Sequence, residues 1–325
     1  MTNTPLTRRI LVPLDGGDLS MSALPFLRAL ATPESEVILL RVVPDGGGLL
    51  DRLVPSRGRA EEILQASVSA ADELLADIRD GLHEMSASIT SLTRVGHPAD
   101  EILAVAEELD VSLIIMATNG HGPIGRMVLG SIANRVAHTA EAPVLLFRPD
   151  KITLPFSEDL LVPLHRVVVP IDGSGRAREA LAPATNIARQ VSVPIHLVRV
   201  VDVEDHIDLD VDALKAEYGD VMSEISTLQS DMHDELEQEA SAIRDQGMDV
   251  STEVLTGGAA SGILGLLKAG DMVVMTSHGE GDAGGLFVGS VTEQLIQQSA
   301  APIVLVPTTR RAAIASSVRS GAVPD

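Results

Sequence analysis

The chain has 325 residues, a formal net charge of −22 and a sequence pI near 4.7, and it contains no cysteine. This length is enough for about two domains, the negative charge argues against a nucleic-acid partner, and the missing cysteines exclude disulfides, thiolate metal sites and cysteine nucleophiles. No apolar run approaches the ~18 residues of a membrane span, so we expect a cytoplasmic protein without membrane contact. With no Trp, one Tyr and four Phe, the core should be aliphatic.

Strand and helix patterns alternate along the first half of the chain. Apolar runs predict strands at 9–15, 37–43, 86–95, 111–116 and 143–147, and periodic apolar positions predict helices at 18–31, 59–79, 101–108 and 132–137. Asp18 or Ser20 is the expected N-cap of the first helix. The run Gly46-Gly47-Gly48 indicates a loop able to close over a ligand. Five strands that alternate with four helices, all strands buried on both faces, predict a doubly wound parallel sheet.

Each half carries the same glycine-bearing loop after its fourth strand. Ala117-Thr118-Asn119-Gly120 is followed after nine residues by Gly130-Ser131, and Thr276-Ser277-His278-Gly279 is followed after nine residues by Gly289-Ser290. A strand that ends in such a loop, and then enters a helix opening on Gly-Ser, directs backbone N–H groups and the positive end of the helix dipole to one point. The pattern predicts an anion site in each half. The alternative is that these glycines only turn the chain.

The second half repeats the first at a nearly constant offset, which indicates a duplication. Residues 166–172 match 9–15 at an offset of 157, and residues 302–306 match 143–147 at an offset of 159. We therefore predict domains at 1–150 and 165–307, a linker at 151–164 and a disordered tail at 308–325. The main departure is an acidic insert at 202–212, before a long helical pattern, which we interpret as a solvated loop rather than a cation site.

Both halves resemble universal stress protein domains, and together they resemble the tandem form of that family. The resemblance covers roughly residues 8–149 and 165–307. It is carried by Val-Pro-Leu-Asp and Val-Pro-Ile-Asp at the first strands, by 39–43 and 197–201 at the second strands, by Gly-His-Pro-Ala-Asp-Glu-Ile at 96–102, and by the two glycine loops. In the nucleotide-binding branch of the family the loop reads G-x2-G-x9-G-(S/T). Both halves fill the last three fixed positions, whereas the first is Ala117 or Thr276.

The resemblance implies two tandem doubly wound, Rossmann-like α/β domains, each a five-stranded parallel sheet with helices on both faces. It also implies an adenine nucleotide in each half, ATP or else AMP or ADP, with or without Mg²⁺. Asp15 and Asp172 would accept a hydrogen bond from the adenine amino group, and Val42 and Val200 would pack on the base; the alternative for the aspartates is an ordinary turn role. The predicted contacts are Pro13, Asp15, Val42, Met116, Ala117, Gly120, Gly130, Ser131 and Ile132 in the first half, and Pro170, Asp172, Val200, Met275, Thr276, Gly279, Gly289, Ser290 and Val291 in the second.

The family resemblance further implies that the terminal strands at 143–147 and 302–306 pair across a two-fold axis. An uncovered apolar edge strand is a liability that such pairing removes. We therefore expect a pseudo-symmetric dimer within one chain, and the sequence leaves dimerisation of the whole chain open. No metal site is predicted.

Nothing in the sequence points to fast catalysis. The glycine loops lack a Walker A lysine, and no Ser/His/Asp constellation or aligned general base is visible. His121 and His278 lie beside the loops, and His97 is interpreted as a turn residue. We predict a nucleotide-binding regulatory protein of the stress response, with protein partners still unknown and nucleotide occupancy as the signal. The alternatives are a slow ATPase or phosphotransferase that uses His121 or His278, and a scaffold whose sites are vestigial because Ala117 and Thr276 exclude the nucleotide.

Overall fold

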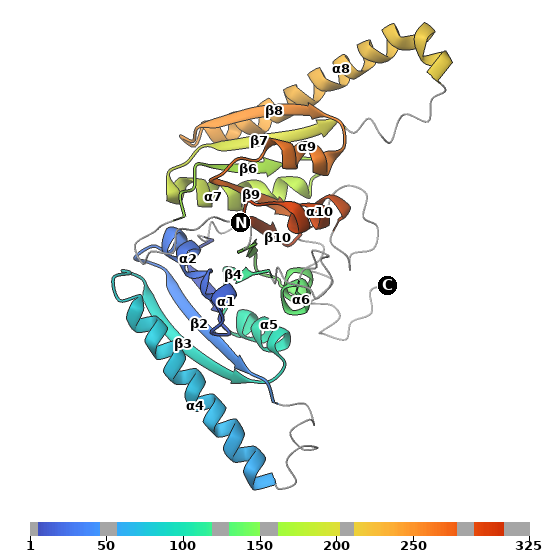
Figure 1. Cartoon of the computed structure of the whole chain (residues 1–325). Helices are drawn as coiled ribbons and strands as arrows, with labels where there is room; N and C mark the ends of the chain where they lie inside the picture. Colours follow the sequence, from blue (N-terminus) through green and yellow to red (C-terminus); the bar gives the residue numbers. More distant parts are fainter. Residues whose placement is uncertain are drawn as a thin grey trace, which may run out of the picture. The chain divides into compact units, whose positions relative to one another are not determined.

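The computed structural model describes residues 6–45, 57–118, 130–149, 162–201, 211–277 and 289–308, without the side chains of 57, 58, 60 and 211–225. The chain divides into two compact units, Met1–Val162 and Pro163–Asp325. The colours of Figure 1 follow the sequence from blue at the N-terminus to red at the C-terminus. The glycine run at 46–48, most of the predicted linker and acidic insert, and nearly all of the predicted tail lie outside the described residues.

In the first unit, parallel strands form a sheet in the order β3-β2-β1-β4-β5. The strands are β1 (Arg9–Pro13), β2 (Glu36–Val43), β3 (Ser88–Val95), β4 (Leu113–Ala117) and β5 (Val144–Phe147). The helices are α1 (Asp18–Met21), α2 (Leu24–Leu30), α4 (Arg57–Gly81), α5 (Pro98–Glu108) and α6 (Ser131–Thr139). The chain moves outward from β1 to β3 and then returns to β4 on the other side of β1, so the strand order reverses between β1 and β4.

The second unit repeats this arrangement in the order β10-β9-β6-β7-β8. Its strands are β6 (Arg166–Pro170), β7 (Ile195–Val201), β8 (Val250–Thr256), β9 (Asp271–Thr276) and β10 (Ile303–Val306). Its helices are the short 3-10 helix η1 (Ala177–Ala180), α7 (Leu181–Val191), α8 (Val211–Arg244), α9 (Ala259–Leu266) and α10 (Ser290–Gln298). The order reverses between β6 and β9. The predicted tandem of doubly wound α/β domains is confirmed.

Because the crossovers are right-handed, the helices that precede β2 and β3 lie on one face of the first sheet and those that precede β4 and β5 lie on the other, and the second sheet repeats this pattern. In the first unit α4 packs on β2 and β3, and α5 and α6 pack together; in the second, α8 packs on β7 and β8, and α9 and α10 pack together (Figure 1). The side chains between these layers are mostly aliphatic, as predicted, and residues such as Leu11, Leu113 and Val168 have no exposed surface. Phe26 and Phe147 are also buried, with ring centroids 4.6 Å apart. Each fully buried side chain of this size contributes about 1.5–3 kcal/mol to folding.

The predicted helix at 18–31 is wrong in one respect, because the structure breaks it into α1 and α2. Pro25 is the reason: its ring cannot donate the hydrogen bond that would continue α1, and it fits only in the first turn of a new helix. The expected N-caps are also wrong, since Gly17 takes the cap position. The hydroxyl of Ser20 instead donates to Oδ1 of Asp15 at 2.6 Å.

The expectation that all strands are buried on both faces is wrong for β3 and β8. No residue of β3 is fully buried, and Val95 is 41% exposed. Because β3 has a neighbouring strand on one side only and carries serine, threonine and arginine, water reaches much of it. The helix predicted at 101–108 begins earlier, at Pro98, with His97 at its N-cap, so His97 is a turn residue as interpreted. Across the described ranges, none of the helices has both the length and the apolar character that crossing a bilayer requires.

Candidate functional site

The carboxyl ends of β1 and β4 lie side by side where the strand order of the first unit reverses. The register pairs Ile10 with Leu113 and Leu11 with Ile114, so Pro13 and Ala117 end their strands at the same edge of the sheet. In open α/β sheets, ligands bind in the crevice outside the carboxyl ends of the strands at this point. In the second unit, Val168 pairs with Val273 across β6 and β9, which places Pro170 and Thr276 at the equivalent edge.

Asp15 follows β1 in a tight turn and is exposed at this edge. Gly16 adopts φ +76, a left-handed conformation that favours glycine. Oδ1 of Asp15 accepts the Gly17 N–H at 2.9 Å and the Ser20 hydroxyl at 2.6 Å. Asp15 therefore does stabilise its own turn, which is the alternative role considered for it. Both of these hydrogen bonds end on Oδ1, and neither uses Oδ2.

Asp172 forms the same turn after β6. Gly173 has φ +91, and Oδ1 of Asp172 accepts the Ser174 N–H at 2.8 Å. The Ser174 hydroxyl in turn accepts the Ala177 N–H at 3.1 Å, at the start of η1. Both predicted aspartates are thus held in one orientation by their own turns, and both are exposed.

Helices α6 and α10 begin on the predicted Gly-Ser pairs. Gly130 and Gly289 are the N-caps, and as glycines they have no side chain that could cap the helix. Ser131 and Ser290 are exposed. In the second unit the Gly289 N–H donates to the Ser277 carbonyl at 3.0 Å, which ties the start of α10 to the end of β9. Gly130 and Gly289 have φ −56 and −58, values open to any residue, so their use here lies in the missing side chain rather than in the backbone conformation.

Several predicted positions occupy the same edge but are less exposed. Val42 and Val200 are half-buried near the ends of β2 and β7, and Ile132 and Val291 are half-buried in the first turns of α6 and α10. Met116 and Met275 are each 6% exposed. Gly120, Gly279, His121 and His278 lie outside the described residues.

The first loop position differs between the units. Ala117 ends β4 and is half-buried, whereas Thr276 ends β9 and is 6% exposed. The Thr276 carbonyl accepts the Thr292 hydroxyl of α10 at 3.4 Å. This bond uses the backbone carbonyl of residue 276 and joins the end of β9 to α10.

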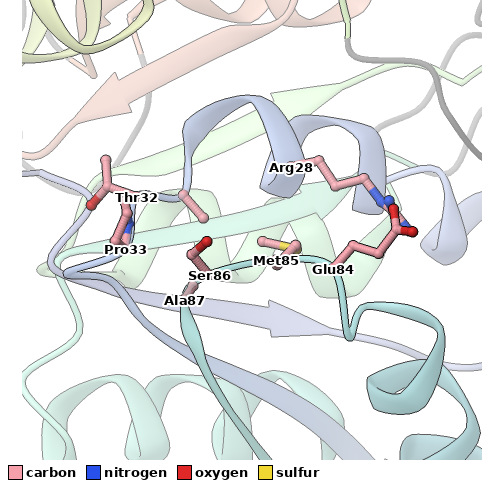
Figure 2. Close-up of a pocket in the computed structure, with 8 residues that line it drawn as sticks. Arg28, Thr32, Pro33, Glu84, Met85, Ser86 and Ala87 are labelled. Carbon is pink, nitrogen blue, oxygen red and sulfur yellow. The ribbon is translucent and has the colours of Figure 1, made fainter.

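A cavity of about 330 Å³ lies away from this edge. Figure 2 shows that it is lined by the segments before β2 and β3, with Arg28, Thr32 and Glu84 around it. It is therefore at the amino ends of the strands and shares no residue with the candidate site. No group of three or more acidic or histidine side chains in the described part of the chain is arranged to hold a metal ion, and the acidic stretch 202–210 lies outside that part.

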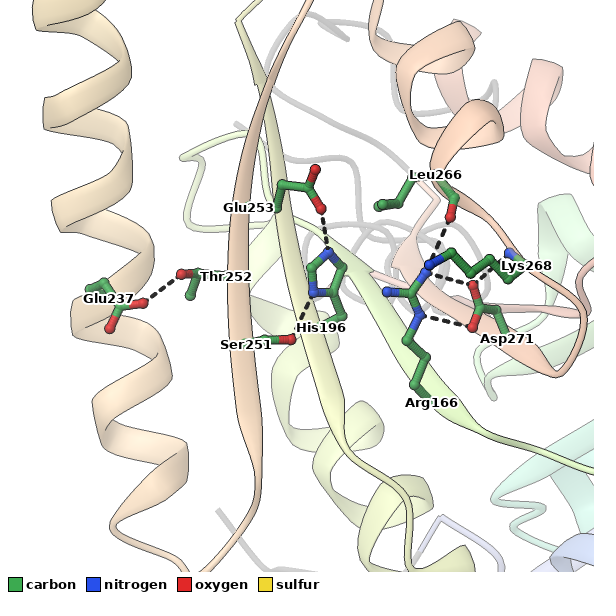
Figure 3. Close-up of polar contacts among 9 residues, drawn as sticks. All are labelled: Arg166, His196, Glu237, Ser251, Thr252, Glu253, Leu266, Lys268 and Asp271. Carbon is green, nitrogen blue, oxygen red and sulfur yellow. Dashed lines mark hydrogen bonds and ion pairs between the residues drawn. The ribbon is translucent and has the colours of Figure 1, made fainter.

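Sequence reasoning missed a polar cluster at the amino ends of the second sheet (Figure 3). Asp271 is only 2% exposed. Its carboxylate accepts hydrogen bonds from Nε and Nη2 of Arg166 and from the backbone N–H of Lys268, each at 2.8 Å. The bond to Asp271 raises the pKa of Arg166. An aspartate at the start of an otherwise apolar strand was the one local signal that could have pointed to this pair.

His196 lies in the same cluster, between two residues of β8. Its Nδ1 is 2.8 Å from the Ser251 hydroxyl and its Nε2 is 3.2 Å from Oε2 of Glu253. Burial lowers the pKa of His196, and the charge of Arg166 lowers it further, against the opposing effect of Glu253. Because the cluster lies at the opposite ends of the strands from the aspartate turns, we assign it to stability rather than to the candidate site.

Known proteins resemble the chain in both sequence and fold. A universal stress protein of Methanocaldococcus jannaschii is 31% identical over 148 residues, which are 45% of this chain and 84% of the relative. One of Mycobacterium tuberculosis is 24% identical over 242 residues, 68% of this chain and 75% of the relative.

Among solved structures, a universal stress protein from Archaeoglobus fulgidus matches with a TM-score of 0.62 and 20% identity, over 93% of this chain and 97% of that one. This likeness supports the fold. The family model described as the universal stress protein family matches residues 7–148 and again 163–307. The chain therefore belongs to the universal stress protein family, with two of its domains in tandem.

Proposed function

We propose that each unit binds one adenine nucleotide, ATP or else AMP or ADP, at the carboxyl edge where its strand order reverses. The observation that carries this proposal is the arrangement in the second unit. There the Asp172 turn follows β6, the neighbouring strand β9 leads into Ser277, and the Gly289 N–H is bonded to the Ser277 carbonyl. A carboxylate and a helix N-terminus thus lie at the same edge of the sheet.

The chemistry of the two flanks suits the two ends of a nucleotide. The first-turn N–H groups of α6 and α10, and the hydroxyls of Ser131 and Ser290, can donate to phosphate oxygens. The carboxylates of Asp15 and Asp172 can accept from an exocyclic amino group of the base. Because the whole chain has a net charge of −22, its long-range electrostatic field repels an anion. Local N–H donors, with or without Mg²⁺, would have to supply the affinity.

We further propose that occupancy, rather than turnover, is the function, as a signal in the stress response. Fast phosphoryl transfer needs positioned positive charge and an oriented nucleophile. The first glycine loop contains Arg126, but the second, residues 280–288, contains two acidic residues and no basic one. A single-turnover assay with bound ATP and Mg²⁺ tests this proposal. Turnover near ~1 per second that is lost in His121→Ala or His278→Ala would support the enzyme alternative instead.

Calorimetric titration of nucleotide-free protein with ATP tests the binding itself. Two sites per chain are expected, and Gly120→Val or Gly279→Val should abolish the site in its own unit, because the added methyl groups would occupy the phosphate position. Gly81→Val is a matched control, since Gly81 has open space where its Cβ would be and ends α4, which leads to the amino end of β3. A stoichiometry of zero would refute the proposal.

The absorbance of the purified protein near 260 nm gives a faster check. A chain without Trp and with one Tyr contributes little there, so co-purified nucleotide would dominate the spectrum. Protein that shows neither co-purified nucleotide nor calorimetric binding would favour the alternative of a scaffold with vestigial sites.

A further inference from the structure

The turn that carries Asp172 rests on a guanidinium group. A Cβ built on Gly173 would lie 2.5 Å from Nη2 and 2.9 Å from Cζ of Arg199. The Arg199 head group therefore lies directly against the backbone of the turn, on the side where the glycine has no side chain. Any residue with a Cβ would displace it.

Arg199 is held from two elements of the second unit. It belongs to β7, and the preceding residue, Val198, accepts the Ile171 N–H at 2.8 Å, immediately before the turn. Its Nη1 forms an ion pair with Oε2 of Glu235 on α8. The Arg199 side chain is 13% exposed and that of Glu235 is 52% exposed. The guanidinium thus has the turn on one side and a helix carboxylate on another.

The first unit supports the same turn differently. A Cβ on Gly16 would lie 2.8 Å from Cδ2 of Leu74, on α4. Arg41, which matches Arg199 in the repeat, has its Nη1 3.4 Å from the Leu14 carbonyl, a long contact. An apolar side chain therefore backs the Asp15 turn, whereas a paired charge backs the Asp172 turn.

We infer that Arg199 is a positioning residue for the ligand site of the second unit, and that Glu235 couples this site to α8. The inference rests on the proposed function, because the turn affects binding only where Asp172 touches the ligand. If α8 moves, the guanidinium moves with Glu235 and the support of the turn changes. By thermodynamic linkage, a ligand that fixes the turn must then also bias α8. In the first unit the equivalent Arg41 makes a long contact to the Leu14 carbonyl, and the side chain that backs Gly16 is Leu74, so this unit is expected to show weaker coupling.

The test uses ATP titrations in which one site at a time is active. In a Gly120→Val background, Arg199→Met should weaken the second site about tenfold, within the usual range for coupling between residues, and Glu235→Gln should weaken it about threefold. Arg199→Lys should recover part of the loss because it restores the charge. The matched control is Arg41→Met in a Gly279→Val background, which should change the first site by less than about twofold.

The amide of Ser174 separates a positioning role from a loss of stability. In ¹⁵N-labelled protein without ligand, its chemical shift should move in Arg199→Met and return toward the parent value in Arg199→Lys, since this N–H bonds to Asp172. An unchanged chemical shift of the Ser174 amide in Arg199→Met would overturn the inference. So would an unchanged ATP affinity of Arg199→Met when its parent protein binds ATP. Equal weakening by Arg41→Met and Arg199→Met would also overturn it. A parent that binds no ATP would refute the proposed function instead, and the ligand-free Ser174 signal would still decide whether Arg199 holds the turn.

Discussion

The two units share one backbone plan but differ at the amino ends of their sheets. Arg9 and Arg166 begin the equivalent strands β1 and β6. Arg9 pairs with Glu36, whose side chain is 53% exposed, and its backbone N–H bonds to the Ser112 hydroxyl at 2.8 Å. Arg166 pairs instead with Asp271, whose side chain is 2% exposed. The same position thus carries a surface ion pair in one unit and a buried one in the other.

The carboxyl ends of the two sheets are alike in this respect. Both units keep an exposed aspartate whose Oδ1 accepts a hydrogen bond from a backbone N–H of its own turn. The halves therefore diverge at the amino ends of their sheets and keep the same aspartate turn at the carboxyl ends. This agreement supports the view that both units are binding units.

The largest expected effect lies at the amino ends. Asp271→Ala should destabilise the second unit by about 3 kcal/mol, because it leaves the half-buried guanidinium of Arg166 without its carboxylate partner. The matched change Ser112→Ala should cost the first unit about 1 kcal/mol, the usual value of a neutral hydrogen bond. Hydrogen-exchange mass spectrometry in urea reports each unit separately. Equal losses would show that the buried pair is no more important than the surface arrangement.

The next effect concerns the aspartate turns. Asp15→Asn and Asp172→Asn keep an oxygen for the turn but remove the charge, so each should weaken nucleotide binding in its own unit about tenfold, as expected for a hydrogen bond to a charged group. Calorimetry on the two variants should give one weakened and one unchanged site in each case. If neither site changes, the aspartates serve their turns alone.

A smaller effect is expected from acidification. Burial holds the pKa of His196 below its unfolded value, so the unfolded chain takes up a proton that the folded second unit resists. The stability of this unit should therefore be complete above the unfolded pKa of about 6.5 and fall as the pH drops below it. The matching position in the first unit is Ile38, which does not titrate. Urea midpoints at pH 7.5 and 5.5 test this; in His196→Gln the second unit should lose this part of its pH dependence.

The smallest effect is expected at the first loop position. Thr276→Ala should strengthen the second site, and Ala117→Thr should weaken the first, each by a few-fold, because the larger side chain at this loop position crowds the proposed nucleotide. A competition titration with a fluorescent adenine nucleotide resolves differences of this size. Opposite signs would mean that Thr276 improves the site through its packing against α10.

Much of the fold follows from local patterns, and the rest depends on partners distant in sequence. The apolar runs and their repeat at an offset near 157 predict the tandem sheets, and the family resemblance predicts the residues at the carboxyl edge. The exposure of β3 was missed because a strand's place at the edge is set by topology rather than by its own sequence. The pair Arg166–Asp271 spans 105 residues, and no local pattern connects the two.

Two of the predictions that remain open concern the terminal strands and the glycine loops. The pairing of 143–147 with 302–306 across a two-fold axis stays a prediction, and small-angle scattering can test it, since a profile of two independently moving bodies would contradict it. The nucleotide contacts of the two glycine loops also stay predictions, because Gly120 and Gly279 lie outside the described residues.

The turn bonds of the two aspartates have a consequence for the thermodynamics of binding. A free aspartate side chain samples several rotamers, and a ligand that needs one of them must restrict it. Here Oδ1 is already engaged by a backbone N–H, at 2.9 Å in one unit and 2.8 Å in the other. The loss of side-chain entropy therefore occurs on folding and is absent from the binding step. For the proposed nucleotide, each unit would offer a preorganised acceptor, and the entropy of association should carry little penalty from these two side chains.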